Sequence, residues 1–170
     1  MPKIKKIPTE DELYNKFSYR CSICEYAPAD IIQKIRQTGA SSDMAERITD
    51  RLIDENFISE ERYAHAFVHD KFQLSRWGRI KIAAALRAKR IPTRLIDNEL
   101  NSIDKEQYTA TLRELLNAKS HRLTEENPLL RTRKLIAFAA SRGFEPHLVM
   151  KLIEDPLLGG EILSSPRASH

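Results

Sequence analysis

The sequence predicts an all-α protein of three tandem three-helix repeats, stacked as a curved, elongated, solenoid-like chain. Two observations favour this fold: helix-start signals recur along the chain, and the apolar residues between them recur at helical spacing. No stretch shows sustained two-residue alternation, and five glycines and eight prolines are few for a sandwich or barrel with many tight turns. We therefore expect helices joined by short connections.

The strongest helix starts stand at Thr9, Ser59 and Asp104, at intervals of 50 and 45 residues. Thr9 and Glu12 fit a T-x-x-E capping box, and Ser59 precedes two glutamates that suit the positive end of a helix. Asn127, which precedes a proline, marks a further start. The near-regular interval indicates an internal repeat.

Three short segments align with one another and support the repeat. They span residues 34–48, 85–100 and 138–153. Each contains a helix end, a tight break, an apolar residue and a new helix start. Gly39 and Gly143 suit the left-handed residue that ends a helix. Arg90 stands at this place in the middle copy, where we expect a costlier or differently shaped turn.

The repeats and the flanking segments divide the chain into five parts. These are a flexible N-terminus (1–8), repeat one (9–56), the basic repeat two (57–103), repeat three (104–155) and a flexible tail (156–170). The tail contains Gly-Gly and Ser-Ser-Pro and shows no helical stripe, so we expect it to be mobile.

The charge distribution points to a binding surface in the middle repeat. Eight positive charges and no acidic residue lie between Lys71 and Arg94, whereas the whole chain has a net charge of only +4. Such a segment attracts phosphate backbones or an acidic protein groove. The alternative is an ordinary solvated helix face. The candidate partner-binding or nucleic-acid-binding residues are Lys71, Arg76, Trp77, Arg79, Lys81, Arg87, Lys89, Arg90 and Arg94.

The segment after Gly78 predicts a helix that runs to about Lys89. Its core-facing residues are expected to be Ile82, Ala85 and Leu86, and its outward-facing residues Ile80, Ala84, Arg87 and Ala88. The charges are spread around this helix, which favours a broad electrostatic surface over a groove-inserting recognition helix. Trp77 has two interpretations: a stacking platform for a base or partner side chain, or a packing anchor at a helix junction.

No motif predicts catalysis, a metal or a cofactor. Cys21 and Cys24 form a lone C-x-x-C without a second ligand pair, which is typical of two small residues on one helix. His65 and His69 have metal-like spacing but no third ligand. Phosphate-cradling loops and nucleophile elbows are absent from the sequence. We expect no enzyme, and no membrane-length apolar run or secretory signal is present, which predicts a cytoplasmic protein.

The middle repeat resembles the most distinctive region of the RecX family, the regulators of the RecA recombinase. The resemblance rests on residues 61–64, 66–68, 71, 77–82, 86–87, 89 and 91–92. It extends more weakly over about residues 10–155 through the three aligned segments. Arg90 departs from the glycine usual in the family at its turn.

This resemblance implies a stack of three-helix repeats that binds the RecA filament. Proteins of this kind usually inhibit strand exchange, ATP hydrolysis and the co-protease activity, and several also bind single- or double-stranded DNA. We expect a monomer, and we expect Arg79→Glu with Arg87→Glu to weaken filament binding without loss of helicity. The alternatives are a RecA-independent DNA-binding protein that uses residues 71–94 and a scaffold for an unrelated acidic protein.

Overall fold

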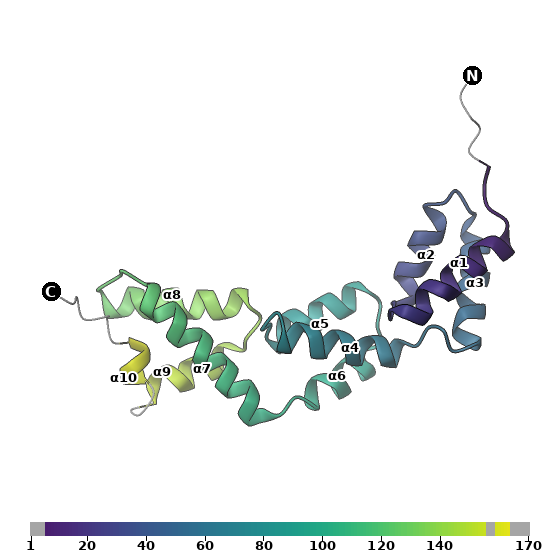
Figure 1. Ribbon diagram of the computed structural model, residues 1–170. Helices are drawn as coiled ribbons and strands as arrows, with labels where there is room; N and C mark the ends of the chain where they lie inside the picture. The colour runs from purple at the N-terminus through teal and green to yellow at the C-terminus, as the bar shows by residue number, and fades with distance from the viewer. Residues whose placement is uncertain (1–5, 156–158, 164–170) are drawn as a thin grey trace, which may run out of the picture. The chain divides into compact units, whose positions relative to one another are not determined.

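The computed structural model describes residues 6–155 and 159–163, and within those residues it contains helices and no strands (Figure 1). The helices are α1 (Glu10–Ile23), α2 (Pro28–Arg36), α3 (Ser42–Asp54), α4 (Glu60–Gln73), α5 (Arg79–Ala88), α6 (Thr93–Asn101), α7 (Lys105–Arg122), α8 (Pro128–Ser141), α9 (Pro146–Glu154) and α10 (Gly159–Leu163). The prediction of an all-α protein is confirmed.

The helices begin where the capping residues place them. Thr9 and Glu12 form the capping box in both directions, with N–H to oxygen distances of 2.8 and 3.3 Å. Ser59, Asp104 and Asn127 each accept hydrogen bonds from first-turn N–H groups at 2.7–3.2 Å. These side chains satisfy backbone donors that have no partner inside the helix.

The turns between the second and third helix of each trio have left-handed residues. Gly39, Arg90 and Gly143 have φ angles of 97°, 60° and 90°. The alignment of the three segments therefore identified the same backbone conformation three times. Two further left-handed residues, Asn56 and Arg76, were not predicted.

The chain contains two compact units that we describe separately. Unit 1 comprises residues 1–68 and 85–97, and unit 2 comprises residues 69–84 and 98–170. The boundary passes through α4, α5 and α6, so both units contain parts of the middle trio. The division into three repeats at residues 56/57 and 103/104 stays a prediction.

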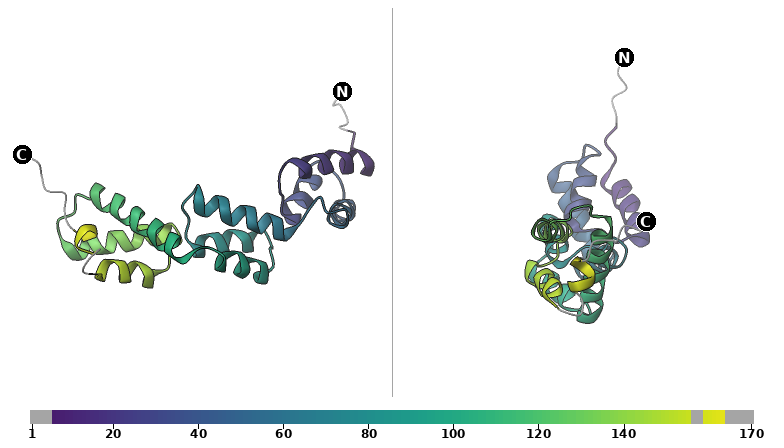
Figure 2. Two further views of the ribbon diagram at one scale, coloured as in Figure 1. Left: turned by 60° about the horizontal axis from the view of Figure 1, so that its bottom comes forward. Right: turned by 90° about the vertical axis from the view of Figure 1, so that its left-hand side faces the viewer.

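In unit 1, α1, α2 and α3 enclose a common apolar core (Figure 2). Its buried members include Phe17, Ile35, Ile48 and Leu52, at 0–1 % exposure. Cys21 lies at the edge of the same cluster, and Cys24 is the exposed residue that follows α1. The sequence had suggested that both cysteines lie on one helix. Only Cys21 lies inside α1, so that expectation is wrong for Cys24.

In unit 2, a buried arginine fastens the connection between α7 and α8. Arg131 is 1 % exposed, and its guanidinium donates to the carbonyl oxygens of Ser120, Leu123 and Glu125 at 2.6–3.1 Å. Buried cations are tolerated only when hydrogen-bonded in this way. Arg131 therefore caps the end of α7, a role that no sequence motif announced.

The segment predicted to be a flexible tail contains a short helix at residues 159–163, and its flexibility stays a prediction. This helix, α10, packs against α7, α8 and α9 (Figure 2). Ile162 is fully buried, and its carbonyl oxygen accepts a hydrogen bond from Ser120 Oγ. Residues 1–5, 156–158 and 164–170 of the two predicted flexible ends lie outside the described residues.

Candidate functional site

The eight cations of the basic segment fall into three environments. Some pair with carboxylates, two lie against the tryptophan ring, and the rest are exposed on the surface. The pairs are Arg76–Glu114, Arg79–Glu145 and Lys89–Asp30; the ring cations are Lys71 and Lys81; the exposed cations are Arg87, Arg90 and Arg94. The predicted site residues therefore do not act as one uniform surface.

Arg79 is held inside unit 2 by three contacts. Its guanidinium lies 3.8 Å from the centre of the Tyr108 ring, and Nη1 lies 3.6 Å from Glu145 Oε1. Its Nε donates to the carbonyl oxygen of Leu100 at 3.3 Å. The Arg79 and Glu145 side chains are only 23 % and 19 % exposed. Because these contacts hold Arg79 within the fold, its replacement by Glu would disturb packing, contrary to our expectation of unchanged helicity.

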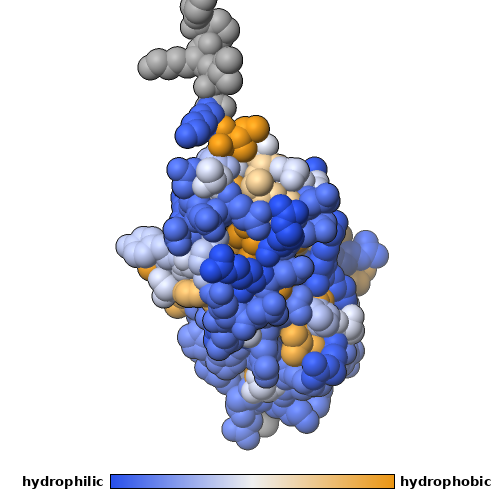
Figure 3. Space-filling model, turned by 90° about the vertical axis from the view of Figure 1, so that its right-hand side faces the viewer, coloured by the Kyte–Doolittle hydropathy of each residue, from blue (hydrophilic) through white to orange (hydrophobic). Residues whose placement is uncertain are grey.

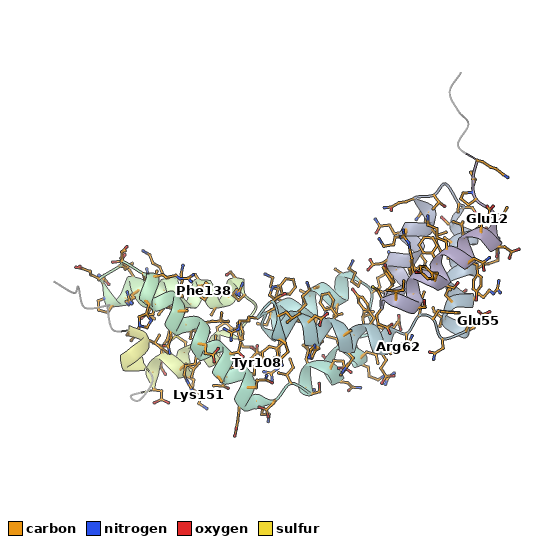
Figure 4. The ribbon with its side chains drawn as sticks, in the orientation of Figure 1. Glu12, Glu55, Arg62, Tyr108, Phe138 and Lys151 are labelled. Carbon is orange, nitrogen blue, oxygen red and sulfur yellow. The ribbon has the colours of Figure 1, made fainter. Side chains whose placement is uncertain are left out.

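Tyr108 stands at the centre of this arrangement (Figure 4). Its hydroxyl donates to Glu145 Oε2 at 2.5 Å and accepts from the backbone N–H of Arg79 at 2.9 Å. Its ring packs between Phe72 and Phe144, with centroid distances of 5.6 and 5.2 Å. Burial, followed by the hydrogen bond to Glu145, raises the pKa of Tyr108 well above its usual value.

Two glycines let the backbone of α8–α9 approach that of α4–α5. The N–H of Gly78 donates to the carbonyl oxygen of Arg142 at 2.8 Å, and the N–H of Ile80 donates to that of Gly143 at 3.0 Å. A Cβ on Gly78 would lie 2.3 Å from the Gly143 backbone, and one on Gly143 would lie 2.5 Å from the backbone nitrogen of Lys81. We call Gly78, Arg79, Tyr108, Gly143 and Glu145 the unit 2 joint.

Trp77 is half-buried, and two lysines lie close to its ring. The Nζ atoms of Lys71 and Lys81 lie 4.8 and 4.4 Å from the ring centre. Lys81 Nζ also lies 3.5 Å from the carbonyl oxygen of Ser141. Contacts of this kind are typical of cation–π interactions and favour the packing-anchor interpretation of Trp77.

A second set of polar contacts joins α1–α3 to the other helices of unit 1. Arg62 Nε lies 2.8 Å from Glu25 Oε1, and the two Nη atoms donate to the side chain and backbone of Asn56 at 2.9 and 3.0 Å (Figure 4). Lys89 Nζ lies 2.8 Å from Asp30 Oδ1. The hydrogen bond to Asp30 raises the pKa of Lys89. We call Glu25, Asp30, Asn56, Arg62 and Lys89 the unit 1 joint.

The remaining cations, Arg87, Arg90 and Arg94, cluster around the turn between α5 and α6. All three are exposed, and no carboxylate of residues 6–155 or 159–163 lies within ion-pair distance of any of them. Ala84 and Ala88 are exposed beside Arg87, as the sequence predicted. We call these three residues the α5–α6 arginines. They are the cations of the segment best placed to meet a partner.

Exposed large apolar residues of unit 1 are few among the residues that the structure describes. Figure 3 displays a face that is mainly hydrophilic, with separated hydrophobic spots. The exposed large apolar residues of this unit are Ile7, Tyr19, Ile23 and Ile53.

The described residues give no support for chemistry at the cysteines or histidines. Burial raises the pKa of Cys21 to about 11, which disfavours the reactive thiolate. His69 is exposed on α4, and its Nδ1 atom lies 3.3 Å from Asp70 Oδ1. Within the described residues, no three His, Cys, Asp or Glu side chains gather as metal ligands. Likewise, no helix of those residues is long and apolar enough to cross a membrane.

The middle trio matches a model of a known family. The model is described as RecX, second three-helix domain, and it matches residues 59–100. The match thus covers α4, α5 and nearly all of α6, together with the whole basic segment.

Several curated proteins named regulatory protein RecX are similar over most of the chain. The Clostridium botulinum (strain Eklund 17B / Type B) protein is 29 % identical over 126 residues, which cover 73 % of this chain and 58 % of that relative. The Chlorobaculum tepidum protein is 25 % identical, covering 74 % of this chain and 76 % of its own. The chain thus spans less than two thirds of the Clostridium protein's length.

Two crystal structures share the fold. RecX from Lactobacillus salivarius has a TM-score of 0.75 at 19 % identity, covering 85 % of this chain and 94 % of its own. A second crystal structure, of a regulatory protein RecX, has a TM-score of 0.75 at 20 % identity. The match covers 86 % of this chain and 72 % of that one. The all-α fold, the family-model match on α4–α6 and the named relatives agree, and the chain is similar to RecX regulatory proteins.

Proposed function

We propose that this protein binds the filament of the RecA recombinase and inhibits its recombinase, ATPase and co-protease activities, as a regulator of DNA repair and recombination. The similarity to proteins named regulatory protein RecX supports regulation, and the family resemblance supplies RecA as the partner. The proposal assigns the contact to the α5–α6 arginines. Catalysis by the protein itself forms no part of it.

The observation that carries the proposal is the unbalanced charge of the α5–α6 arginines. A nucleoprotein filament is polyanionic, so exposed guanidinium groups that have no internal carboxylate are available to it. Arg76, Arg79 and Lys89 have internal carboxylates close by and add less to the outward field. We therefore narrow the proposed contact from the nine predicted residues to Arg87, Arg90 and Arg94.

The direct test is a titration of the DNA-dependent ATPase of RecA with this protein at low and at physiological salt. We expect inhibition in both conditions and a higher half-inhibitory concentration at the higher salt, because exposed charges are screened. Arg87→Glu with Arg94→Glu should raise that concentration at least about tenfold, since two attractive contacts become repulsive.

The matched control reverses two cations elsewhere. Arg133 on α8 and Lys151 on α9 are exposed and have no carboxylate within ion-pair distance in the described residues. Arg133→Glu with Lys151→Glu changes the net charge equally and should inhibit RecA like the unmodified protein. Equal inhibition by both double variants, with unchanged helicity by circular dichroism, would refute the assigned contact.

A second function, RecA-independent DNA binding, is favoured by the same three cations. If the α5–α6 arginines each contact one phosphate of duplex DNA, log affinity should fall with log salt at a slope of about −2.7. This function would be favoured if the protein bound DNA without RecA at the same concentrations at which it inhibits RecA. A flat salt dependence would exclude it.

A further inference from the structure

A polar groove lies within unit 1, between the first trio and the end of α5. Its volume is about 860 Å³. One wall is formed by α2 and the turn into α3, and the other by the last residue of α5 and the turn that follows. The lining residues that matter here are Asp30, Gln33, Arg36, Lys89 and Arg90, with Ala40 and Ala88. None of the interactions described above fills this groove.

The charge of the groove is positive after its internal pair is counted. Asp30 is the one carboxylate among the lining residues, and Lys89 lies 2.8 Å from it. The hydrogen bond to Asp30 raises the pKa of Lys89 and so favours the charged ammonium. The two opposite charges of this ion pair balance one another. Arg36 and Arg90 remain, and both are exposed without an ion-pair partner in the described residues.

The two guanidinium groups belong to opposite walls. Arg36 is the last residue of α2, and Arg90 is the left-handed residue after α5. The carbonyl oxygens near the end of α2 are already occupied, because the N–H groups of Gln37, Thr38 and Gly39 bond to them at 3.0 Å. These carbonyls therefore offset little of the positive charge. Arg36 and Arg90 thus line the groove from its two walls, and guanidinium groups suit a carboxylate.

The remaining lining favours a polypeptide over a nucleic acid. No lining residue is aromatic, so the groove has no platform on which a base could stack. Ala29, Ala40 and Ala88 instead provide small apolar surfaces that allow close approach of a peptide backbone, and the amides of Gln33 and Gln37 offer neutral hydrogen-bonding groups.

We propose that this groove binds an acidic polypeptide segment, with a carboxylate of the segment between Arg36 and Arg90. This goes beyond the proposed function, because it assigns a ligand chemistry to a groove that shares only Arg90 with the α5–α6 arginines, and its test does not use RecA.

The test uses fluorescence anisotropy of a short labelled peptide of alternating Glu and Ala, at low salt and without RecA. We expect binding by the full-length protein, and a loss of about tenfold in Arg36→Gln with Arg90→Gly. Asp30→Asn should tighten binding several-fold, because it removes the competing carboxylate and releases Lys89. A gain of affinity cannot arise from misfolding. Arg133→Gln with Lys151→Gln is the control for net charge and should bind as the unmodified protein does.

Three results would overturn the proposal. One is equal binding of a peptide with Gln in place of Glu. Another is unchanged affinity in the Arg36/Arg90 variant. The last is a single-stranded oligothymidylate that competes for the same two arginines more strongly than the peptide, which would make the groove a phosphate site. Because RecA is absent, each result is independent of whether the proposed inhibition holds.

Discussion

The two joints of the molecule fasten helices by different physical means. The unit 2 joint uses backbone hydrogen bonds through Gly78 and Gly143 and a buried aromatic stack around Tyr108. The unit 1 joint uses ion pairs with partly exposed side chains: 40 % and 31 % for Arg62–Glu25, and 39 % and 21 % for Lys89–Asp30. Close backbone contact tolerates no added atoms, whereas exposed ion pairs are weak and sensitive to salt.

This contrast changes how the Trp77-Gly78-Arg79 triplet of the basic segment is understood. Gly78 and Arg79 belong to the unit 2 joint, and Trp77 packs with two lysines. The triplet therefore has a structural explanation that does not require a bound partner. The exposed charge lies further along the chain, at Arg87, Arg90 and Arg94.

The largest expected effect is the replacement of Gly143 by Ala. The new Cβ would lie 2.3 Å from Lys81 Cβ and 2.5 Å from its backbone nitrogen, at a φ of +90°. Both the clash and the left-handed backbone disfavour it, and we expect a loss of about 3 kcal/mol or more in the free energy of unfolding. Urea denaturation followed by circular dichroism measures this loss.

Gly39→Ala is the matched control for this prediction. Gly39 has a similar φ of +97°, but a Cβ there meets only the Ile7 side chain, at 3.5 Å. Its cost should be limited to backbone strain, about 1–2 kcal/mol. Equal losses of unfolding free energy in the two variants would show that the close backbone approach at the unit 2 joint adds nothing to the cost of Gly143→Ala.

The next effect is the removal of the Tyr108 hydroxyl. Tyr108→Phe keeps the ring contacts but leaves Glu145 Oε2 and the N–H of Arg79 without their partner, so we expect a loss of about 1–3 kcal/mol. Because the pKa of Tyr108 is raised in the folded protein, its neutral form contributes stability that is fully present below the unfolded pKa of 10.0. That contribution is lost as pH rises above this value towards the folded pKa.

The pH dependence separates the hydroxyl from a general packing defect. The difference in unfolding free energy between Tyr108→Phe and the unmodified protein should shrink above about pH 10. Tyr19→Phe, at an exposed residue of α1, is the control for loss of a surface hydroxyl and should leave the unfolding free energy at neutral pH unchanged. A difference for Tyr108→Phe that stays constant from pH 8 to pH 11 would contradict the assignment.

A smaller effect is expected at the unit 1 joint. Arg62→Gln removes the ion pair with Glu25 and the contacts with Asn56, and we expect a loss of about 0.5–1 kcal/mol, because these side chains are partly exposed. The loss should fall further in 1 M salt, where the Debye length is about 3 Å. Thermal unfolding at low and high salt measures it. If the loss exceeded that of Tyr108→Phe and ignored salt, the contrast between the joints would be wrong.

The sequence predicted the features that depend on neighbouring residues. The caps at Thr9, Ser59 and Asp104 follow from residues within about one helical turn, whereas the turn at Arg90 was predicted from the alignment of its segment with those of Gly39 and Gly143. The contacts of Tyr108 could not be predicted, because its partners Arg79 and Glu145 are 29 and 37 residues away.

The features that the sequence did not reveal also depend on contacts between residues far apart in the chain. The short helix α10 carries no apolar stripe of its own, and the burial of Ile162 depends on packing against other helices. The charges of the basic segment could be counted from the sequence, but their internal carboxylate partners could not. Only the fold showed that Arg79 is held by Glu145, whereas Arg87 has no carboxylate within ion-pair distance in the described residues.

The smallest expected effect is a gain in the free energy of unfolding at the turn between α5 and α6, where Arg90 lies. Arg90 has a φ of 60°, where a side chain is disfavoured and glycine is not. Arg90→Gly should raise the free energy of unfolding by about 0.5–1 kcal/mol, since relief of backbone strain exceeds the greater flexibility of glycine in the unfolded chain. Arg87→Gly, three residues earlier and inside α5, should instead lower it by about 1 kcal/mol. Opposite signs for the same substitution would assign the gain to the left-handed backbone and not to the lost charge. If both variants lost stability, the left-handed backbone at Arg90 would carry no strain. The middle turn would then cost no more than the glycine turns of the other two trios.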